Sequence, residues 1–167
     1  MTAGDRPTVL DTSVLSNFAH VDHVDLLVDL PRVATVVAVE TELTDGVGTY
    51  QYLDRALAIL DDGVPVCAPS DSATELETEL LETLDPGEAQ AMAVAAAGDG
   101  TLVTDDGDAR SVASDRGVDL TGSIGLLVRF VEHDRLSVST ADKYLKRWID
   151  EAGFRSPARD FEAFLES

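Results

Sequence analysis

The stretch TLVTDDGDAR, residues 101–110, joins a short strand to a cluster of aspartates. Its first four residues are apolar or β-branched, which suits a buried extended segment. Asp105, Asp106 and Asp108 follow directly after that segment. Carboxylates this close repel one another, so the stretch indicates either a bound cation or a chain that is acidic throughout.

The composition shows that the chain is indeed acidic throughout. Its 167 residues include 32 Asp and Glu against 12 Lys and Arg, which gives a formal net charge of −20. Only Lys143 and Lys146 are lysines, and the hydrophobic fraction of 44% is ordinary for a globular protein. This combination is typical of adaptation to high salt, so we expect a halophilic archaeal source. An acid is therefore informative here only where its structural position is specific.

Length and residue usage narrow the class of protein further. We expect one domain over residues 1–167, with the C-terminal helices of about 123–167 belonging to it. The single cysteine, Cys67, excludes an internal disulfide and a cysteine-built zinc site, and its apolar neighbours predict burial. No apolar stretch approaches the roughly 20 residues that span a bilayer, and no signal peptide is evident. We therefore expect a cytoplasmic protein with no membrane partner.

Short apolar strands alternate with helical segments along the whole chain. Strands are expected at 8–10, within 32–43 (where a strand runs into a helix), at 64–68, at 101–104 and at 118–120. Helices are expected from Thr12 or Ser13 as cap, at 24–30, 50–60, 73–84 (capped by Ser72), 88–97, 108–116, 124–135, 140–152 and 154–167. No hairpin signal links neighbouring strands. The pattern predicts an α/β fold with three layers, α/β/α, around a short-stranded parallel sheet.

Acidic residues recur where these strands end. They are Asp11 after the first strand, Glu40 and Glu42 past the second, Asp105 and Asp106 after the fourth, and Glu88 in the helix before the fourth. Ligands of open α/β sheets bind outside the carboxyl ends of the strands. Four separate segments can therefore bring carboxylates to one edge of the sheet, with no lysine or histidine among them.

Such a group of carboxylates favours a hard divalent cation. Without cationic partners the acids cannot all stay ionised unless a cation lies between them. Oxygen ligands favour Mg²⁺ or Mn²⁺ over zinc, and such a site suits phosphodiester hydrolysis because the metal activates water and neutralises phosphate charge. For Glu88 an alternative stays open, since helix starts favour acids through capping and the helix dipole.

Three other classes of acidic site fit the sequence poorly. A response-regulator domain needs a lysine at the end of a late strand, but both lysines fall in an expected helix. A phosphatase with an aspartate nucleophile needs Asp-x-Asp after the first strand, where this chain has Asp11-Thr12-Ser13. An EF-hand fails because the residues around Asp106 break its ligand spacing.

Four segments together resemble PIN-domain proteins, in particular the archaeal and bacterial branch related to VapC toxins. They are VLDTSVLSNFA, LDPGEAQAMAVAAA, TLVTDDGDARSVASDRGV and LTGSIGLLVRFVEHDRLS. The resemblance runs from about Thr8 to the end of the chain and is weakest between residues 48 and 80. It implies a PIN-like, Rossmann-like sheet and a metal-dependent ribonuclease with an acidic Mg²⁺ or Mn²⁺ site.

The resemblance also implies which residues act. The catalytic and metal-binding acids are Asp11, Glu42, Glu88 and Asp106. Glu42 is selected because the family's acid stands directly before a leucine, and Glu40 is the runner-up. Asp105 and Asp108 are less certain ligands, and Asp108 is equally well explained as a helix cap.

Neighbouring residues receive supporting roles from the same resemblance. Thr12 or Ser13 is expected to hydrogen-bond to the site, and Arg110 to pair with Asp106 or with an RNA phosphate. The chain departs from the family at residues 122–123, where Gly-Ser replaces Gly-Thr, a mild change in helix capping.

The implied function is an Mg²⁺- or Mn²⁺-dependent endoribonuclease that cleaves tRNA, rRNA or mRNA. It would be the toxin of a VapBC-type pair, with an antitoxin protein as partner, and a homodimer. Leu126, Leu127 and Phe130 are candidates for the dimer interface. Otherwise these three residues belong to the core of the chain and the interface lies elsewhere. The alternative is a catalytically silent PIN-fold module that binds nucleic acid or a protein partner.

The net charge argues against an RNA ligand, because no basic stripe of the kind found in nucleic-acid-binding proteins is evident. Screening by high salt and local divalent ions would reduce this repulsion. Arg6, Arg110 and Arg116 are also expected to form a small basic patch once the chain is folded.

Overall fold

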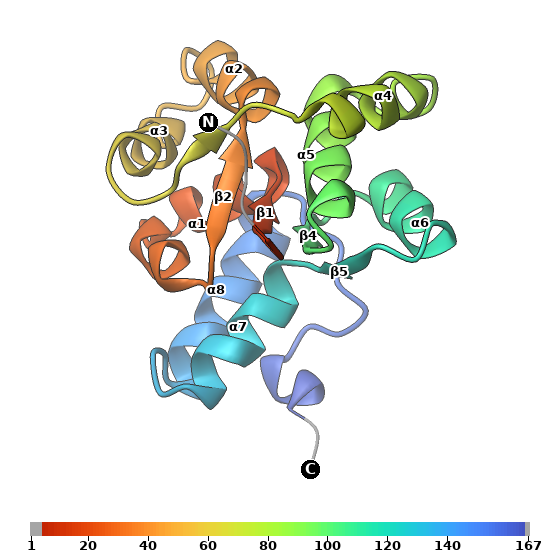
Figure 1. Cartoon of the computed structure of the whole chain (residues 1–167). Helices are drawn as coiled ribbons and strands as arrows, with labels where there is room; N and C mark the ends of the chain where they lie inside the picture. The colour runs from red at the N-terminus through yellow and green to blue at the C-terminus, as the bar shows by residue number, and fades with distance from the viewer. Residues whose placement is uncertain (1–4, 166–167) are drawn as a thin grey trace.

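Five short strands form one parallel sheet in the order β3-β2-β1-β4-β5 (Figure 1). They are β1 (Thr8–Leu10), β2 (Val33–Val36), β3 (Val66–Cys67), β4 (Thr101–Val103) and β5 (Asp119–Thr121). In the computed structural model, which describes residues 5–165, Val9 faces Ala34 on one side and Leu102 on the other. These central residues are buried, so both faces of the sheet need a helical cover.

Helices connect the strands and supply that cover. In chain order they are α1 (Thr12–His20), the 3₁₀ helix η1 (Val24–Asp29), α2 (Val37–Gly46), α3 (Leu53–Asp61), α4 (Asp71–Leu80), α5 (Pro86–Ala97), α6 (Gly107–Asp115), α7 (Ser123–Glu132), α8 (Val138–Glu151) and the 3₁₀ helix η2 (Phe161–Phe164). Helix α5 contacts β1, β2 and β4 and lies beside α6, whereas α1, α7 and α8 gather on the other side (Figure 1). The predicted three-layer α/β/α fold with a parallel sheet is confirmed.

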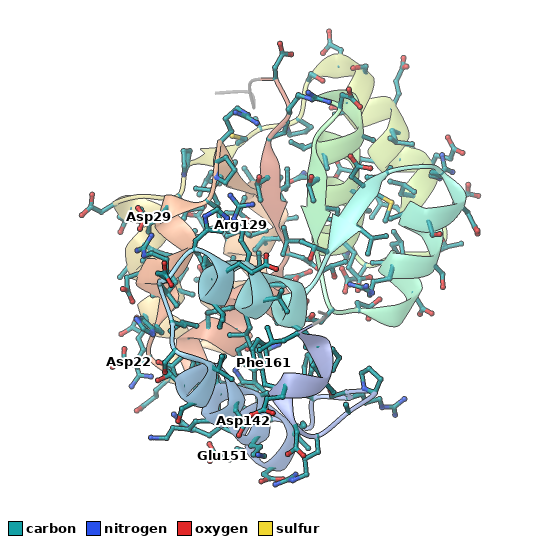
Figure 2. The ribbon with its side chains drawn as sticks, turned by 90° about the horizontal axis from the view of Figure 1, so that it is seen from below. Asp22, Asp29, Arg129, Asp142, Glu151 and Phe161 are labelled. Atoms are coloured by element: carbon teal, nitrogen blue, oxygen red, sulfur yellow. The ribbon has the colours of Figure 1, made fainter. Side chains whose placement is uncertain are left out.

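The C-terminal helices pack into the same buried cluster as the sheet, which extends from Val9 to Phe161. The Trp148 side chain is fully buried, and its indole N–H donates to the Asn17 carbonyl oxygen at 2.8 Å. Phe161 is also buried, and its backbone N–H donates to Asp142 of α8 at 2.9 Å; both residues are labelled in Figure 2. The chain after α8 is thereby fastened to α8.

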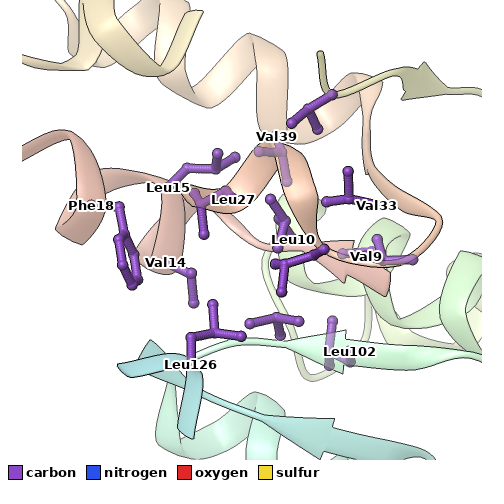
Figure 3. Packing of buried hydrophobic residues seen from close by; sticks show 14 of the residues in the cluster. Val9, Leu10, Val14, Leu15, Phe18, Leu27, Val33, Val39, Leu102 and Leu126 are labelled. Carbon is purple, nitrogen blue, oxygen red and sulfur yellow. The ribbon is translucent and has the colours of Figure 1, made fainter. Parts of the chain in front are cut away.

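Part of the core lies between β1 and the start of α7. Val9 and Leu10 lie in the same close-up as Leu126, which faces the strands from the start of α7 (Figure 3). Leu126, Leu127 and Phe130 are at most 3% exposed. The hypothesis that they form a dimer interface is therefore wrong, because their apolar surface is buried within this chain.

Several element boundaries differ from the sequence prediction. The segment expected as a helix at 24–30 is a 3₁₀ helix, and the helix expected at 73–84 ends at Leu80. Its cap is Ser70 rather than Ser72, because the Ser70 hydroxyl accepts the Ala73 N–H at 3.2 Å. Helix α1 is likewise preceded by Asp11 in the cap position, with Thr12 as its first residue.

The largest difference is at the end of the chain, where a helix was expected over 154–167. Only Phe161–Phe164 are helical, as a 3₁₀ turn, and residues 166–167 lie outside the described range. Gly153 adopts a φ of 69°, which ends α8, and Pro157 cannot donate a helical hydrogen bond. Among residues 5–165, no helix is both long and apolar enough to cross a membrane.

Candidate functional site

Asp11 lies at the carboxyl end of the central strand and is the most buried acid of the site, with 3% of its surface exposed. The Thr104 hydroxyl donates to its Oδ2 at 2.7 Å, while its buried Oδ1 has no hydrogen-bond partner among the described residues. Burial, with smaller contributions from the charges of Asp85 and Glu42, raises the pKa of Asp11 to about 7. The site therefore contains a buried carboxylate oxygen, Asp11 Oδ1, that no hydrogen-bond donor of the described residues contacts.

Asp106 follows β4, the strand that pairs with β1, and lies at the same edge of the sheet as Asp11. Its backbone N–H donates to the Thr104 hydroxyl at 3.2 Å, so one hydroxyl links Asp11 and Asp106. The Asp106 Oδ2 accepts the Ala109 N–H at 3.0 Å, which caps α6. The carboxylate is thus fixed at the start of α6 by one of its oxygens.

Glu88 belongs to a capping box at the start of α5. The Asp85 carboxylate accepts the Glu88 N–H at 2.9 Å, and the Glu88 carboxylate accepts the Asp85 N–H at 3.2 Å. Burial, hydrogen bonding to Asp106 and the charge of Asp85 raise the pKa of Glu88 to about 8. Glu88 therefore caps the helix and also lies against Asp106, while its role as a metal ligand stays a prediction.

Helix α2 brings Glu42 to this edge. The Thr12 hydroxyl donates to its Oε1 at 2.5 Å, and the Gly87 N–H donates to its Oε2 at 3.0 Å. A Cβ on Gly87 would lie 2.5 Å from the Glu42 Oε1, so any other residue there would displace this carboxylate from its position. Within residues 5–165, no hydrogen bond joins the Glu40 carboxylate to the other acids.

Asp105 has a structural role that the sequence did not reveal. Its Oδ1 accepts the Ser123 N–H at 2.7 Å, and its Oδ2 accepts the Asn17 amide at 2.9 Å and the Ser123 hydroxyl at 2.5 Å. Its own N–H donates to the Ser13 hydroxyl at 3.0 Å. Asp105 thus joins β4 to the starts of α1 and α7, and its two oxygens are both engaged.

The other predicted neighbours lie at the margin of the site. Asp108 is exposed in the first turn of α6 and is not the cap, which is Asp106. Arg110 donates to the Thr104 carbonyl oxygen at 3.0 Å and has no ion pair with Asp106. Arg6 and Arg116 do not form a patch with it, since Arg6 lies near the start of β1 and Arg116 pairs with Glu79 at 2.6 Å.

Sequence reasoning missed Asp85 as a member of this acidic group. It interpreted Asp-Pro-Gly at 85–87 only as a break before the helix. The available signal was the spacing of Asp85 and Glu88 around Pro86, which is typical of a capped helix start. Such a cap holds an aspartate at a helix N-terminus, here next to Glu88.

The acids at this edge match a divalent ion in their chemistry, but not in their present spacing. In the part of the chain that the structure describes, no three Asp, Glu, His or Cys side chains lie close enough together to enclose one as they stand. The chemistry of the donors nevertheless fits Mg²⁺ or Mn²⁺, because every candidate supplies carboxylate oxygen. The unpartnered Asp11 Oδ1 and the raised pKa values of Asp11 and Glu88 are what an acidic site without a counter-cation produces.

Comparison with known proteins gives the family. Residues 7–167 match the family DUF3368, described as a PIN domain, and the chain therefore belongs to the PIN-domain family. Its structure is similar to that of VapBC-1 from nontypeable Haemophilus influenzae, with a TM-score of 0.52 and 15% identity over 70% of this chain and 97% of that one. At that identity the likeness concerns the fold alone. A search of curated proteins found no match.

Proposed function

We propose that this PIN-domain protein is a divalent-metal-dependent endoribonuclease, with Asp11, Glu42, Glu88 and Asp106 as its acids. PIN domains are generally nucleases, and the chain belongs to that family. The observation that carries the proposal is the buried Asp11 Oδ1, which has no partner at an edge where three other elements also supply carboxylates.

In this mechanism Asp11, Glu88 and Asp106 would hold the metal, and Glu42 would support them. A bound Mg²⁺ or Mn²⁺ would supply an activated water and neutralise charge on the phosphate. Thr104 orients Asp11 and Asp106 together, since its hydroxyl donates to one and accepts from the backbone of the other. The Thr12 hydroxyl and the Gly87 N–H both donate to the Glu42 carboxylate and hold it toward the same edge.

We further propose that the protein is the toxin of a VapBC-type pair. The similar structure from Haemophilus influenzae is described as VapBC-1, which supports an antitoxin protein as partner. A homodimer is also proposed, with a surface other than Leu126, Leu127 and Phe130. The charge of −20 supports a cytoplasm rich in salt, as in a halophilic archaeon.

Replacing Asp106 tests the enzymatic proposal. Asp106→Asn retains an oxygen that can accept the Ala109 N–H, so we expect the fold to persist. Cleavage of total tRNA and rRNA with Mn²⁺ in high KCl should fall to the level of a control without enzyme. Asp108→Asn, which changes the same charge at an exposed position two residues away, should cleave like the wild type. If Asp106→Asn cleaved as fast as the wild type, the assignment would be wrong.

The alternative is a PIN-fold module that binds nucleic acid or a protein without cleaving RNA. Titration of Mn²⁺ followed by thermal unfolding separates the two functions. If the protein is the metal-dependent enzyme, Mn²⁺ should raise the Tm of the wild type and should raise the Tm of Asp106→Asn by less. Equal Tm values with and without Mn²⁺ in both proteins would support the silent module.

A further inference from the structure

The cationic side chains are distributed unevenly in this acidic chain. Within residues 5–165, six of the twelve have an acid within 4.0 Å, namely Arg55, Arg116, Arg135, Lys146, Arg147 and Arg159. The other six are Arg6, Arg32, Arg110, Arg129, Lys143 and Arg155. With 32 acids available, cations that remain without an acidic partner identify places where an external anion can bind.

Five of these six line cavities. Arg6, Arg32 and Arg129 (labelled in Figure 2) line a cavity of about 440 Å³ beside the starts of the strands. Arg110 and Arg155 line a larger one, of about 800 Å³, at the carboxyl ends of β4 and β5. The larger cavity is the one that bears on the proposed reaction, because Asp106 forms part of its wall.

We call the larger cavity the C-terminal cavity. Its lining is partly charged and partly apolar. Arg110 on α6 and Arg155 on the chain after α8 supply charge, while Leu120, Ile124 and Phe154 supply apolar surface. Phe154 is only partly buried, and its ring lies 5.7 Å from the Trp148 ring. Asp105 also lines the cavity, but its oxygens are already occupied by the donors of Asn17 and Ser123.

We propose that the C-terminal cavity binds one nucleotide of a single-stranded RNA, next to the phosphate that is cleaved. This inference rests on the proposed function and names its substrate class. The apolar wall with Phe154 accepts the base, and the guanidinium groups of Arg110 and Arg155 contact the adjoining phosphates. The volume lies within the range of pockets that enclose small organic ligands, roughly 300–1,000 Å³.

A single strand is required because a base can enter the cavity only when it is unstacked. In a duplex the bases are stacked and paired, and the deep groove of A-form RNA keeps their edges from side chains. A base splayed out of a single strand can instead stack on an aromatic ring, which is largely independent of sequence. The cavity therefore selects for loops or unpaired segments of RNA rather than for helices.

Binding to a short fluorescein-labelled single-stranded RNA tests this site without cleavage. All binding is measured in the Asp11→Asn variant, so that the RNA is not cleaved, at one fixed KCl concentration with Mg²⁺. The Asp11 side chain is buried and does not line the cavity. Arg155→Glu should weaken binding by about tenfold or more, and Phe154→Leu, which keeps apolar volume but removes the ring, by about fivefold or more. Lys143→Glu is the matched control, because it reverses the charge of an exposed cation outside both cavities.

The outcomes separate this inference from the proposed function. Equal weakening by Arg155→Glu and Lys143→Glu would overturn it, since binding would then depend only on net charge. Equal affinity for the same RNA as a duplex would also overturn it, as would unchanged binding by both cavity variants. If the wild type failed to cleave RNA while the cavity variants still lost binding selectively, the nuclease proposal would fail and the nucleotide site would stand.

Discussion

At the scale of single residues, position along a strand was more informative than residue type. Asp11 and Asp106 could be placed at one edge from sequence, because the ends of parallel strands meet there. The choice between Glu40 and Glu42 could not be made from the pattern of residues alone. Glu42 is held by Thr12 and by Gly87, whose N–H is 45 residues away in sequence, and such contacts become visible only when the chain is folded.

The raised pKa of Asp11 predicts a dependence of stability on pH in the metal-free protein. The folded state keeps the proton to about pH 7, whereas an unfolded aspartate releases it near its ordinary value of 3.8. Between these values the unfolded state binds fewer protons, so Asp11 lowers the free energy of unfolding as pH rises. Relative to Asp11→Asn, the wild type should lose on the order of 4 kcal/mol over this range.

Urea unfolding of both proteins in a chelator at several pH values measures this difference. Asn keeps an oxygen for the Thr104 hydroxyl, so the variant reports the charge rather than the hydrogen bond. Adding Mn²⁺ near pH 7.5 should stabilise the wild type and have little effect on the variant. A difference between the two proteins that stayed constant from pH 4 to pH 7 would refute the assigned titration.

At the scale of elements, the sequence predicted the helices and strands better than their ends. Capping decides those ends, and several residues could serve as caps in a chain rich in Ser, Thr and Asp. Ser70 rather than Ser72 caps α4, and Asp106 rather than Asp108 caps α6. The role of Asp105 was equally hidden, because its partner Asn17 is 88 residues away.

Asp105 is therefore predicted to matter for stability more than its neighbour. Asp105→Ala would leave the N–H and the hydroxyl of the fully buried Ser123 without their acceptor and remove one acceptor of the Asn17 amide. We expect a loss on the order of 2 kcal/mol in the free energy of unfolding. The exposed Asp108→Ala should change it by less than about 0.5 kcal/mol. Urea unfolding compares them, and equal losses would show that Asp105 does not join these elements.

At the scale of the whole molecule, the α/β class and the layer order could be predicted because alternation of strands and helices leaves few topologies. The sequence could not show where the few cations would lie. Arg110 and Arg155 are 45 positions apart in the chain and line one cavity only because the segment after α8 returns to the edge of the sheet. That same segment was wrongly expected to be a helix, so the cavity could not be foreseen.

The charge of −20 predicts that salt stabilises the folded protein. Raising KCl from about 0.1 M to about 1 M shortens the screening length from about 10 Å to about 3 Å, which weakens repulsion among surface acids. The Tm should therefore rise over this range. A variant with the exposed Asp61, Glu75 and Glu82 replaced by amides should show a smaller rise. An identical rise in both proteins would indicate that KCl acts otherwise than by screening.

Trp148 gives this protein an internal optical reporter. It is the single tryptophan of the chain, it is fully buried, and its ring lies 5.3 Å from that of Phe18 in α1. Its indole N–H is bonded to the backbone of Asn17, the residue whose side chain reaches Asp105. Its fluorescence emission therefore follows whether α8 remains docked on the helix that leads out of the site. Docking of α8 can thus be followed in the native, unlabelled chain.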